Sequence, residues 1–301
     1  MKKQNKPAMK PLSDLTLMDR FLFACAMEDP VILQTVLEII LEKEIHLKER
    51  IQAEKELRTA PWLRSVRLDV ISMDYEENVY NTEVQKKNTG NLLKRSRFYQ
   101  TLVDSSLLAP GEIDFNKMPS AYLIMIAPFD LFGEGKYCYT FQMKCKEVES
   151  LWMTDGATRI FLNTHGKNPE EVNEALVELL HYFEQTTDEA ASQSSSRIKE
   201  IHRRVSQIKS SEKIGVRYMQ EWEERAYELQ EAREQGIEYG IEQGMERGME
   251  RGMECGIRAL VQDNLEEGVS KEKILLKLQK RFSLDEPKAD AYFERFSKAE
   301  N

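Results

Sequence analysis

The feature that most constrains the fold is a segment in which two short apolar stretches each carry one carboxylate. The stretches are Arg67-Leu68-Asp69-Val70 and Asn81-Thr82-Glu83-Val84-Gln85, and the polar residues 74–78 lie between them. β-Branched and aromatic residues on both sides of a polar turn predict a β-hairpin. A carboxylate within an apolar strand is costly unless it is paired or binds a cation. The segment therefore predicts a hairpin in which both acids need a partner.

Whether these two carboxylates meet depends on the register of the hairpin. Directly opposed residues of an antiparallel pair point to the same face of the sheet. Asp69 lies beside Glu83 only if odd-numbered residues oppose odd-numbered ones, and this register requires a loop of three or five residues or a bulge. A two-residue turn at Glu76-Glu77 would place the acids on opposite faces and would exclude a shared site.

Composition and charge exclude several classes of protein. The chain has 301 residues, of which 41% are hydrophobic and 32% are charged, so it can form one large domain or two ordinary ones. Its net charge of −9 argues against a generally basic coat for nucleic acid, so that any such contact needs a local basic face. No apolar run approaches the roughly 20 residues of a membrane span. We expect a cytoplasmic protein without a membrane partner.

Cysteine and histidine spacing argues against a zinc site. The cysteines have no CxxC spacing, which is typical of buried thiols in a reducing compartment: Cys25, Cys138, Cys145 and Cys255. The histidines form no HxxxH or HExxH pattern, which argues against a zinc hydrolase: His46, His165, His181 and His202.

Apolar spacing along the chain predicts a mixed core of strands and helices. Ser13-Asp14 is expected to cap a helix that begins near Leu15, and further helices are expected over 31–41, 92–108 and 169–185. Apolar or alternating runs predict strands over 120–127, 137–145 and 159–164, and residues 42–60 are expected to mix loop and helix. This order predicts an α/β (α+β) fold with a mixed central sheet flanked by helices.

The C-terminal third has a different composition and a glycine repeat. Residues 192–196 resemble a linker, and the chain beyond Arg197 has the spacing of helices throughout. Within it glycine recurs at every fourth position, with a glutamate two residues before each glycine and Ile or Met directly after it: Gly236, Gly240, Gly244, Gly248, Gly252 and Gly256. Two small amphipathic helices are expected after the repeat, around 258–282 and 286–298.

The hairpin and the residues after it have the chemistry of a phosphodiester-cleaving site. Paired carboxylates followed by a polar side chain suit Mg²⁺ (or Mn²⁺), which prefers oxygen ligands and keeps several waters. Such a cation activates water and neutralises charge on a phosphate. A basic cluster without any acid follows, and it is typical of contacts to a DNA backbone: Lys86, Lys87, Lys94, Arg95 and Arg97.

The order of these motifs resembles a known family. Asp69, then Glu83-x-Gln85, then a helix with Arg95-Ser96-Arg97-Phe98-Tyr99-Gln100 is similar to the PD-(D/E)xK nuclease superfamily. Later segments resemble its recombination-promoting nuclease / putative transposase branch: residues 122–130, Tyr139-Thr140-Phe141, Asp155-Gly156 with Ile160-Phe161-Leu162-Asn163, and the glycine repeat. The resemblance covers roughly residues 13–260 and implies a restriction-endonuclease-like core.

The resemblance also implies a function and a set of site residues. It implies a Mg²⁺-dependent DNA endonuclease, connected with recombination or transposition, in which Asp69 and Glu83 are both catalytic and metal ligands. Gln85 occupies the position at which the superfamily usually has lysine, and a neutral amide orients water without supplying positive charge. Lys87 shares the face of Gln85 if the strand continues. The phosphate-binding residues are expected to be Lys86, Lys87, Arg95 and Arg97, with Gln100 and Tyr99 in support.

These interpretations predict that the chain has five parts. They are a polar tail over 1–12, a nuclease-like domain over 13–190, a helical extension over 191–235, the repeat helix over 236–257, and a small helical segment over 258–301.

Simpler interpretations of the same residues remain open from the sequence. Asp69 and Glu83 are equally compatible with the solvent face of a half-open sheet, and Lys86 and Lys87 with an ordinary strand edge. Arg97 is spaced to pair with Asp104, and Tyr99 has the character of a core residue. Acids of the N-terminal helices, Asp19 or Glu38, are candidates to complete a metal shell.

Two alternatives concern the whole protein. The same fold could serve as a catalytically inactive DNA-binding or interaction protein that oligomerises through its C-terminal helices. The glycine repeat fits either a segment of helical self-association or a weakly helical spacer, because glycine costs about 1 kcal/mol relative to alanine inside a helix. Glutamates in every repeat exclude a membrane GxxxG pairing.

Overall fold

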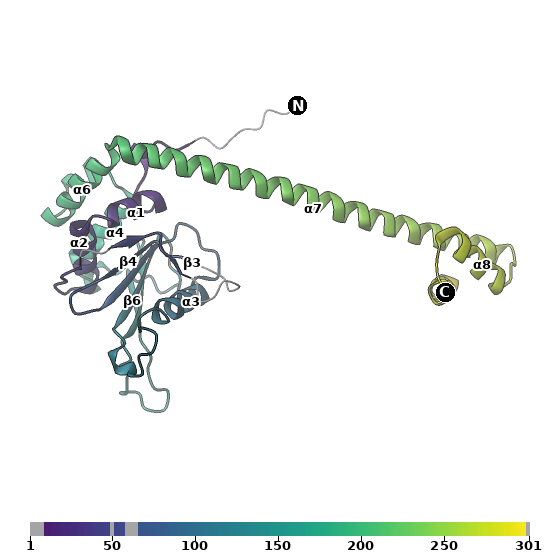
Figure 1. Ribbon diagram of the computed structural model, residues 1–301, viewed down its shortest axis with the longest axis horizontal. Coiled ribbons are helices and arrows are strands. Elements are labelled where there is room, and N and C mark those ends of the chain that lie inside the picture. Colours follow the sequence, from purple (N-terminus) through teal and green to yellow (C-terminus); the bar gives the residue numbers. More distant parts are fainter. Residues whose placement is uncertain (1–8, 49–50, 58–65, 299–301) are drawn as a thin grey trace. The chain divides into compact units, whose positions relative to one another are not determined.

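The computed structural model describes residues 9–48, 51–57 and 66–298. These residues form a mixed α/β fold with a six-stranded sheet, flanking helices and a long helical C-terminal region (Figure 1). The predicted fold class is thereby confirmed. The chain divides into two compact units, one that ends at Trp222 and one that begins at Glu223.

The central sheet has the strand order β1-β4-β5-β6-β8-β7. Its three middle strands are parallel, and the strands added at both sides are antiparallel to their neighbours. The bounds are β1 (Gln52–Ala53), β4 (Val70–Met73), β5 (Val79–Val84), β6 (Ala121–Ala127), β7 (Cys138–Phe141) and β8 (Ala157–Asn163). A separate antiparallel pair is formed by β2 (Glu56–Leu57) and β3 (Val66–Arg67).

Helices cover both faces of this sheet because its middle strands are apolar on both sides. One face packs against α1 (Arg20–Met27), α2 (Pro30–Leu41), α4 (Glu174–Glu184) and α6 (Ser196–Lys209), with Tyr80 and Val84 of β5 in the shared core. The other face packs against α3 (Leu92–Asp104), which shares a second core with Val79 of β5. The site residues of β5 are therefore enclosed between layers.

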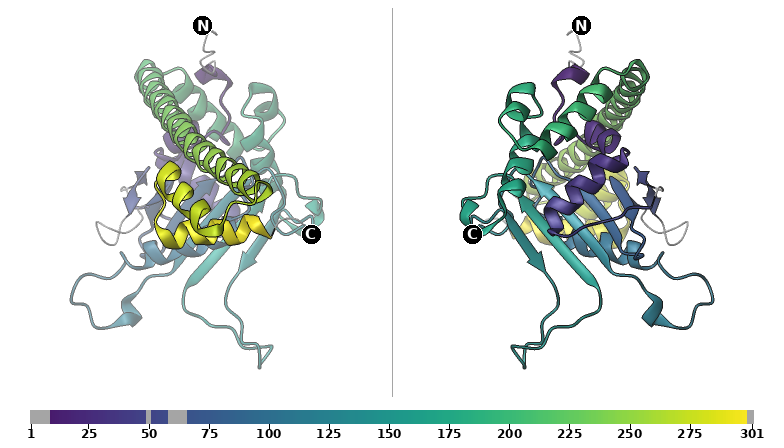
Figure 2. Two further views of the ribbon diagram at one scale, coloured as in Figure 1. Left: turned by 90° about the vertical axis from the view of Figure 1, so that its right-hand side faces the viewer. Right: turned by 90° about the vertical axis from the view of Figure 1, so that its left-hand side faces the viewer.

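The connections before β6 and β8 leave the sheet at one end. Residues 105–120, with the turn Phe115–Lys117, precede β6, and residues 142–156 precede β8. Because β5, β6 and β8 are parallel, both connections lie at the end where these strands begin (Figure 2). Glu83 lies near the end of β5, so the acid pair is at the opposite end of the sheet.

Several predicted boundaries are wrong, each for a local reason. The first helix begins at Arg20 rather than near Leu15, because Leu12–Asp14 forms a 3-10 turn and Asp19 is the residue before the helix. The helix of residues 92–108 ends at Asp104, and the one expected from Pro169 consists of a 3-10 turn (Pro169–Glu171) followed by α4.

The segments that surround the sheet also differ from the expectation. Within residues 42–60 the described part contains the short strands β1 and β2 rather than a helix, and residues 49–50 and 58–60 lie outside the described residues. The strand expected over 137–145 is limited to β7. The linker expected over 192–196 is the junction of α5 (Asp188–Ser192) and α6. Most of the tail expected over 1–12 lies outside the described residues.

The C-terminal unit has a hydrophobic core of its own. It contains most of α7 (Glu212–Glu266), α8 (Lys271–Phe282) and α9 (Glu286–Ser297). The core contains Ile257, Val261, Ile274, Leu278, Ala289, Phe293 and Phe296. The helix expected over 258–282 is interrupted at Gly268, whose φ of 72° ends α7.

Candidate active site

The hairpin has the register that brings the two acids together. In β4 and β5, Val70 opposes Thr82 and Met73 opposes Val79, which leaves a loop of five residues, 74–78. Asp69 lies directly before β4, outside this ladder, and its backbone N–H donates to Glu83 Oε1 at 3.0 Å. The odd-with-odd register of the ladder is therefore confirmed, and the two acids lie next to each other.

A buried aspartate fixes the length of this loop. Asp74 is 3% exposed, and its carboxylate accepts hydrogen bonds from the Asn78 backbone N–H at 2.8 Å and from the Tyr80 hydroxyl at 2.6 Å. Glu77 adopts a positive φ of 69°, which turns the chain back toward β5. The five-residue loop, and with it the register of the acids, depends on these local bonds.

Backbone N–H groups orient one oxygen of each site acid. Val84 N donates to Asp69 Oδ2 at 3.2 Å, and Asp69 N donates to Glu83 Oε1 at 3.0 Å. Asp69 is 2% exposed and Glu83 is fully buried. The oxygens left for other partners are Asp69 Oδ1 and Glu83 Oε2.

Two arginines approach these remaining oxygens from opposite faces of the sheet. Arg20 of α1 forms an ion pair with Asp69 in which Nε and Oδ1 are 2.7 Å apart. Arg95 of α3 lies further away, with 3.8 Å between Nη2 and Glu83 Oε2. Within the described part of the chain, Glu83 Oε2 has no hydrogen-bond donor.

Burial makes both acids harder to ionise, and the neighbouring Asp69 charge adds to this effect at Glu83. Burial raises the pKa of Asp69, although the Arg20 charge and the Val84 N–H act in the opposite direction. Burial and the neighbouring Asp69 charge raise the pKa of Glu83 well above its ordinary value. A carboxylate pair of this kind gains most when a cation is placed between its members.

Gln85 is connected to the acid pair through Arg95. Arg95 Nη1 donates to Gln85 Oε1 at 2.9 Å, and Arg95 Nε donates to the Tyr99 hydroxyl at 2.7 Å. Tyr99 is also a core residue, and its ring lies 4.8 Å from the Arg95 guanidinium carbon. The structure therefore brings Gln85, Arg95 and Tyr99 together with the two acids.

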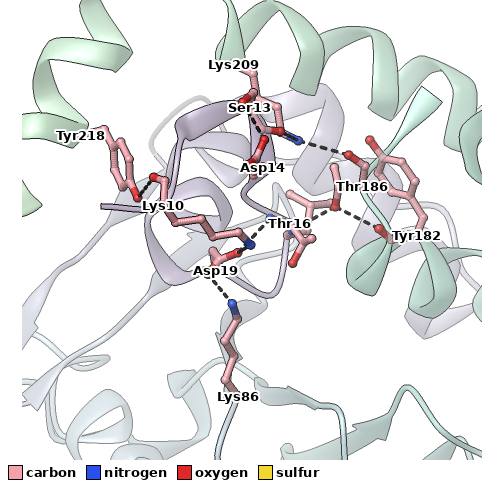
Figure 3. Close-up of polar contacts among 11 residues, drawn as sticks. Lys10, Ser13, Asp14, Thr16, Asp19, Lys86, Tyr182, Thr186, Lys209 and Tyr218 are labelled. Carbon is pink, nitrogen blue, oxygen red and sulfur yellow. Dashed lines mark hydrogen bonds and ion pairs between the residues drawn. The ribbon is translucent and has the colours of Figure 1, made fainter. Parts of the chain in front are cut away.

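The other residues expected at the site lie elsewhere. Gln100 is buried but donates to Asp104 at 2.8 Å, so Asp104 is bonded to Gln100 and not to Arg97. Lys86 forms an ion pair with Asp19 (Figure 3). β5 ends at Val84 and the chain bends at Lys86 and Lys87, so Lys87 does not share the face of Gln85.

Arg20 is the site residue that the sequence analysis missed. The sequence contained a signal for it, because Arg20 is the single charged residue in the apolar helix α1. An arginine at the start of such a helix needs an acidic partner. Which acid it meets is decided by the packing of α1 on the sheet.

The residues present fit a hard divalent cation with few protein ligands. Among the described residues, no cluster of three or more His, Cys, Asp and Glu side chains could hold a metal ion, so neither Asp19 nor Glu38 completes a metal shell with the two acids. Glu38 instead accepts a hydrogen bond from Gln34 at 3.1 Å. Two carboxylates with one buried, unbonded oxygen suit Mg²⁺ or Mn²⁺, which complete their coordination with water or phosphate.

A comparison with protein families agrees with this geometry. The family model described as PD-(D/E)XK nuclease family transposase matches residues 19–236, which is more than half of the chain. The chain belongs to this family. Membership in the PD-(D/E)XK nuclease family confirms the predicted resemblance, and it assigns a nuclease or transposase type of function in general, with DNA as the implied substrate.

No curated protein and no solved structure gave a match to this PD-(D/E)XK family member. In residues 9–48, 51–57 and 66–298, no helix combines the length and the apolar character that crossing a membrane requires.

Proposed function

We propose that this chain is a divalent-metal-dependent DNA endonuclease connected with recombination or transposition, with Asp69 and Glu83 as ligands of Mg²⁺ or Mn²⁺. The observation that supports the proposal most directly is the acid pair itself. Both carboxylates are buried side by side, and a backbone N–H orients one oxygen of each. Two buried acids side by side are costly to a fold, and cation binding explains the arrangement.

The protein residues around the cation would bind and orient the reactants. When bound, a divalent cation supplies charge that activates water and offsets the phosphate charge. Gln85 lies beside the pair, and its amide N–H groups can donate to a water oxygen but cannot accept the proton of that water. We therefore assign Gln85 an orienting role and not that of a general base.

Arg95 supplies the positive charge that a lysine at position 85 would have supplied. Its guanidinium contacts Gln85 at 2.9 Å and lies 3.8 Å from Glu83. Tyr99 holds the same guanidinium through a hydrogen bond of 2.7 Å. The charge is thus displaced from the strand to helix α3 but remains next to the proposed metal ligands.

Exposed basic residues beside the site are the proposed contacts to DNA phosphates. Lys87 and Arg97 are exposed, and within the described residues neither forms an ion pair. Lys86 is less available because Asp19 already pairs with it. Gln100 belongs to the helix α3 framework through Asp104, so we assign it a supporting role.

A second function is favoured by one specific observation. Arg20 and Arg95 already balance the charge of the acid pair, which would also stabilise a catalytically inactive DNA-binding protein on this fold. Cleavage and binding therefore need separate measurements.

A plasmid-nicking assay tests the proposal. The wild-type protein should nick supercoiled DNA with Mg²⁺ or Mn²⁺ and lose this activity in EDTA. Asp69→Asn and Glu83→Gln should each lower the rate at least about a hundredfold, because each removes a charged metal ligand. DNA affinity, measured by fluorescence anisotropy, should change little, because neither acid attracts phosphate.

The matched control is Glu178→Gln. Glu178 accepts a hydrogen bond from Ser195 N at 3.1 Å, away from the acid pair, and its variant should nick at the wild-type rate. Wild-type nicking by Asp69→Asn would refute the assigned ligands. Metal-independent binding without any nicking would instead establish the inactive DNA-binding protein.

A further inference from the structure

Asp19, directly before helix α1, and Arg20, its first residue, have opposite charges and each pairs with an opposite charge at the site. Arg20 Nε lies 2.7 Å from Asp69 Oδ1, and the Asp19 carboxylate pairs with Lys86. Lys86 follows Glu83 by three positions. One acid and one base of the site region are therefore both held by the start of a single helix.

The backbone that carries these two residues is firmly anchored. Seven of the eight residues of α1 are buried, all except Arg20 itself. Asp19 also accepts the Thr16 N–H at 2.9 Å and pairs with Lys10 at 3.4 Å (Figure 3). The Arg20 side chain, in contrast, is 38% exposed. Besides the ion pair, the guanidinium donates from Nη2 to Arg67 O at 3.5 Å, a long hydrogen bond.

Arg20 pairs with one of the two carboxylate oxygens that accept no backbone N–H. Asp69 Oδ2 and Glu83 Oε1 already accept backbone N–H groups. Asp69 and Glu83 would hold a cation, and the oxygens of the pair that accept no backbone N–H are Asp69 Oδ1 and Glu83 Oε2. Glu83 Oε2 has no donor within the described residues, whereas Asp69 Oδ1 is held by Arg20.

We propose that Arg20 is an internal competitor for the divalent cation and that it weakens metal binding until DNA is present. The inference rests on the proposed metal-dependent function. When both acids are ionised, Arg20 and Arg95 balance their charge, and a dication added beside both arginines would meet unbalanced positive charge. DNA phosphates offset this charge and offer Arg20 another partner. Metal and DNA would then bind cooperatively.

The test measures Mn²⁺ affinity by calorimetry in the absence of DNA, with Arg20→Met as the main variant. Removing the competitor should tighten Mn²⁺ binding at least about fivefold, because the metal no longer displaces an ion pair. Addition of a short, uncleavable DNA duplex should tighten Mn²⁺ binding to the wild type more than to Arg20→Met. Arg20→Lys keeps a charge without the planar guanidinium fork and should give an intermediate affinity.

Two controls separate competition from general effects. Lys86→Met removes a nearby positive charge that does not touch Asp69, and Arg204→Met removes an arginine that pairs with Asp29 at 2.8 Å. Neither should tighten Mn²⁺ binding as Arg20→Met does. If Arg20→Met does not fold, Arg20→Lys becomes the test variant, and it too should bind Mn²⁺ more tightly than the wild type.

The outcomes distinguish the competitor from the proposed function. Wild-type binding that depends on Asp69, together with equal or weaker binding by Arg20→Met, would overturn the competitor alone. Equal tightening by Lys86→Met would also overturn it, in favour of a general charge effect. Absence of any Asp69-dependent Mn²⁺ binding in wild type and variants would reject the metal site and, with it, the competitor.

Discussion

At the scale of single residues, charge placement decides what this site can do. The acid pair, Gln85 and Arg95 form one hydrogen-bonded and ion-paired group. The position that usually carries a lysine is neutral, and a helix supplies the charge instead. Substituting Gln85 by lysine would therefore place two cations next to each other, beside an arginine that already contacts position 85.

Asp19 gives a prediction about pH at this scale. Burial alone would raise the pKa of Asp19, but hydrogen bonds from Lys86 and Thr16 N and the charges of Lys86 and Lys10 outweigh it, so the pKa lies below the ordinary 3.8. The unfolded state therefore binds the proton more readily than the folded state. The stability that the Asp19 charge contributes is full above pH 3.8 and is lost as the pH falls through the lowered pKa.

Urea unfolding of wild type and Asp19→Asn checks this sign. The variant should be about 0.5–1 kcal/mol less stable at pH 7, the usual range for a partly exposed ion pair. The difference should persist down to about pH 4 and shrink below it. A difference that grows on acidification would contradict the assignment.

At the scale of elements, the turn of the hairpin controls the site. The loop 74–78 sets the register through the bonds of Asp74, and the register sets the face on which Glu83 lies. A shift by one residue moves every side chain of a strand to the other face. Loop length is therefore as important for the site as the acids themselves.

Two loop deletions test this dependence. Deletion of Glu77 preserves the five-residue loop only if β5 slips by one residue, which turns Glu83 to the other face, so metal-dependent nicking and Mn²⁺ binding should be lost. Deletion of Glu76 and Glu77 together makes β5 slip by two residues, so Glu83 keeps its face and this variant should retain more binding than the single deletion. Circular dichroism monitors the fold, and better binding by the single deletion would contradict the register argument.

At the scale of the whole molecule, the two units have separate hydrophobic cores. The glycine repeat lies in α7, and its apolar residues before Ile257 are exposed, including Ile241 at 58% and Met249 at 72%. An added Cβ at Gly240, Gly244 or Gly248 would meet nothing within 4 Å of its own chain. These glycines are thus not needed for packing within one copy of the chain.

A triple substitution of these glycines by alanine tests whether they serve a second copy. Each alanine should favour the helix by about 1 kcal/mol. We predict that the wild type self-associates through residues 236–257 and that the triple variant associates more weakly, because its added methyl groups prevent close approach of two helices. Sedimentation velocity gives the number of copies per particle. An unchanged number of copies after deletion of 233–257 would instead identify the repeat as a spacer.

The sequence determined much of the fold because its signals are local. Continuous apolar runs marked β6 and β8, and the Pro30 position with the apolar spacing after it marked α2. The predicted start of α1 was wrong, and so was the helix expected within residues 42–60, where the structure has short strands. The pairing partners of these strands are distant in sequence, as Gln52 with Ile71 shows. Short strands of this kind have no periodicity of their own.

For the candidate site, the residue types were predictable from the sequence, but their contacts were not. The sequence by itself predicted the residue types of the candidate site: two acids in a hairpin, a glutamine in place of a lysine, and a basic helix after them. Only the tertiary structure decided that Arg20 meets Asp69, that Arg95 rather than Lys87 lies beside Gln85, and that Lys86 pairs with Asp19. Residue type and spacing are encoded locally, whereas the partner of a charge depends on how helices from opposite faces pack on the sheet.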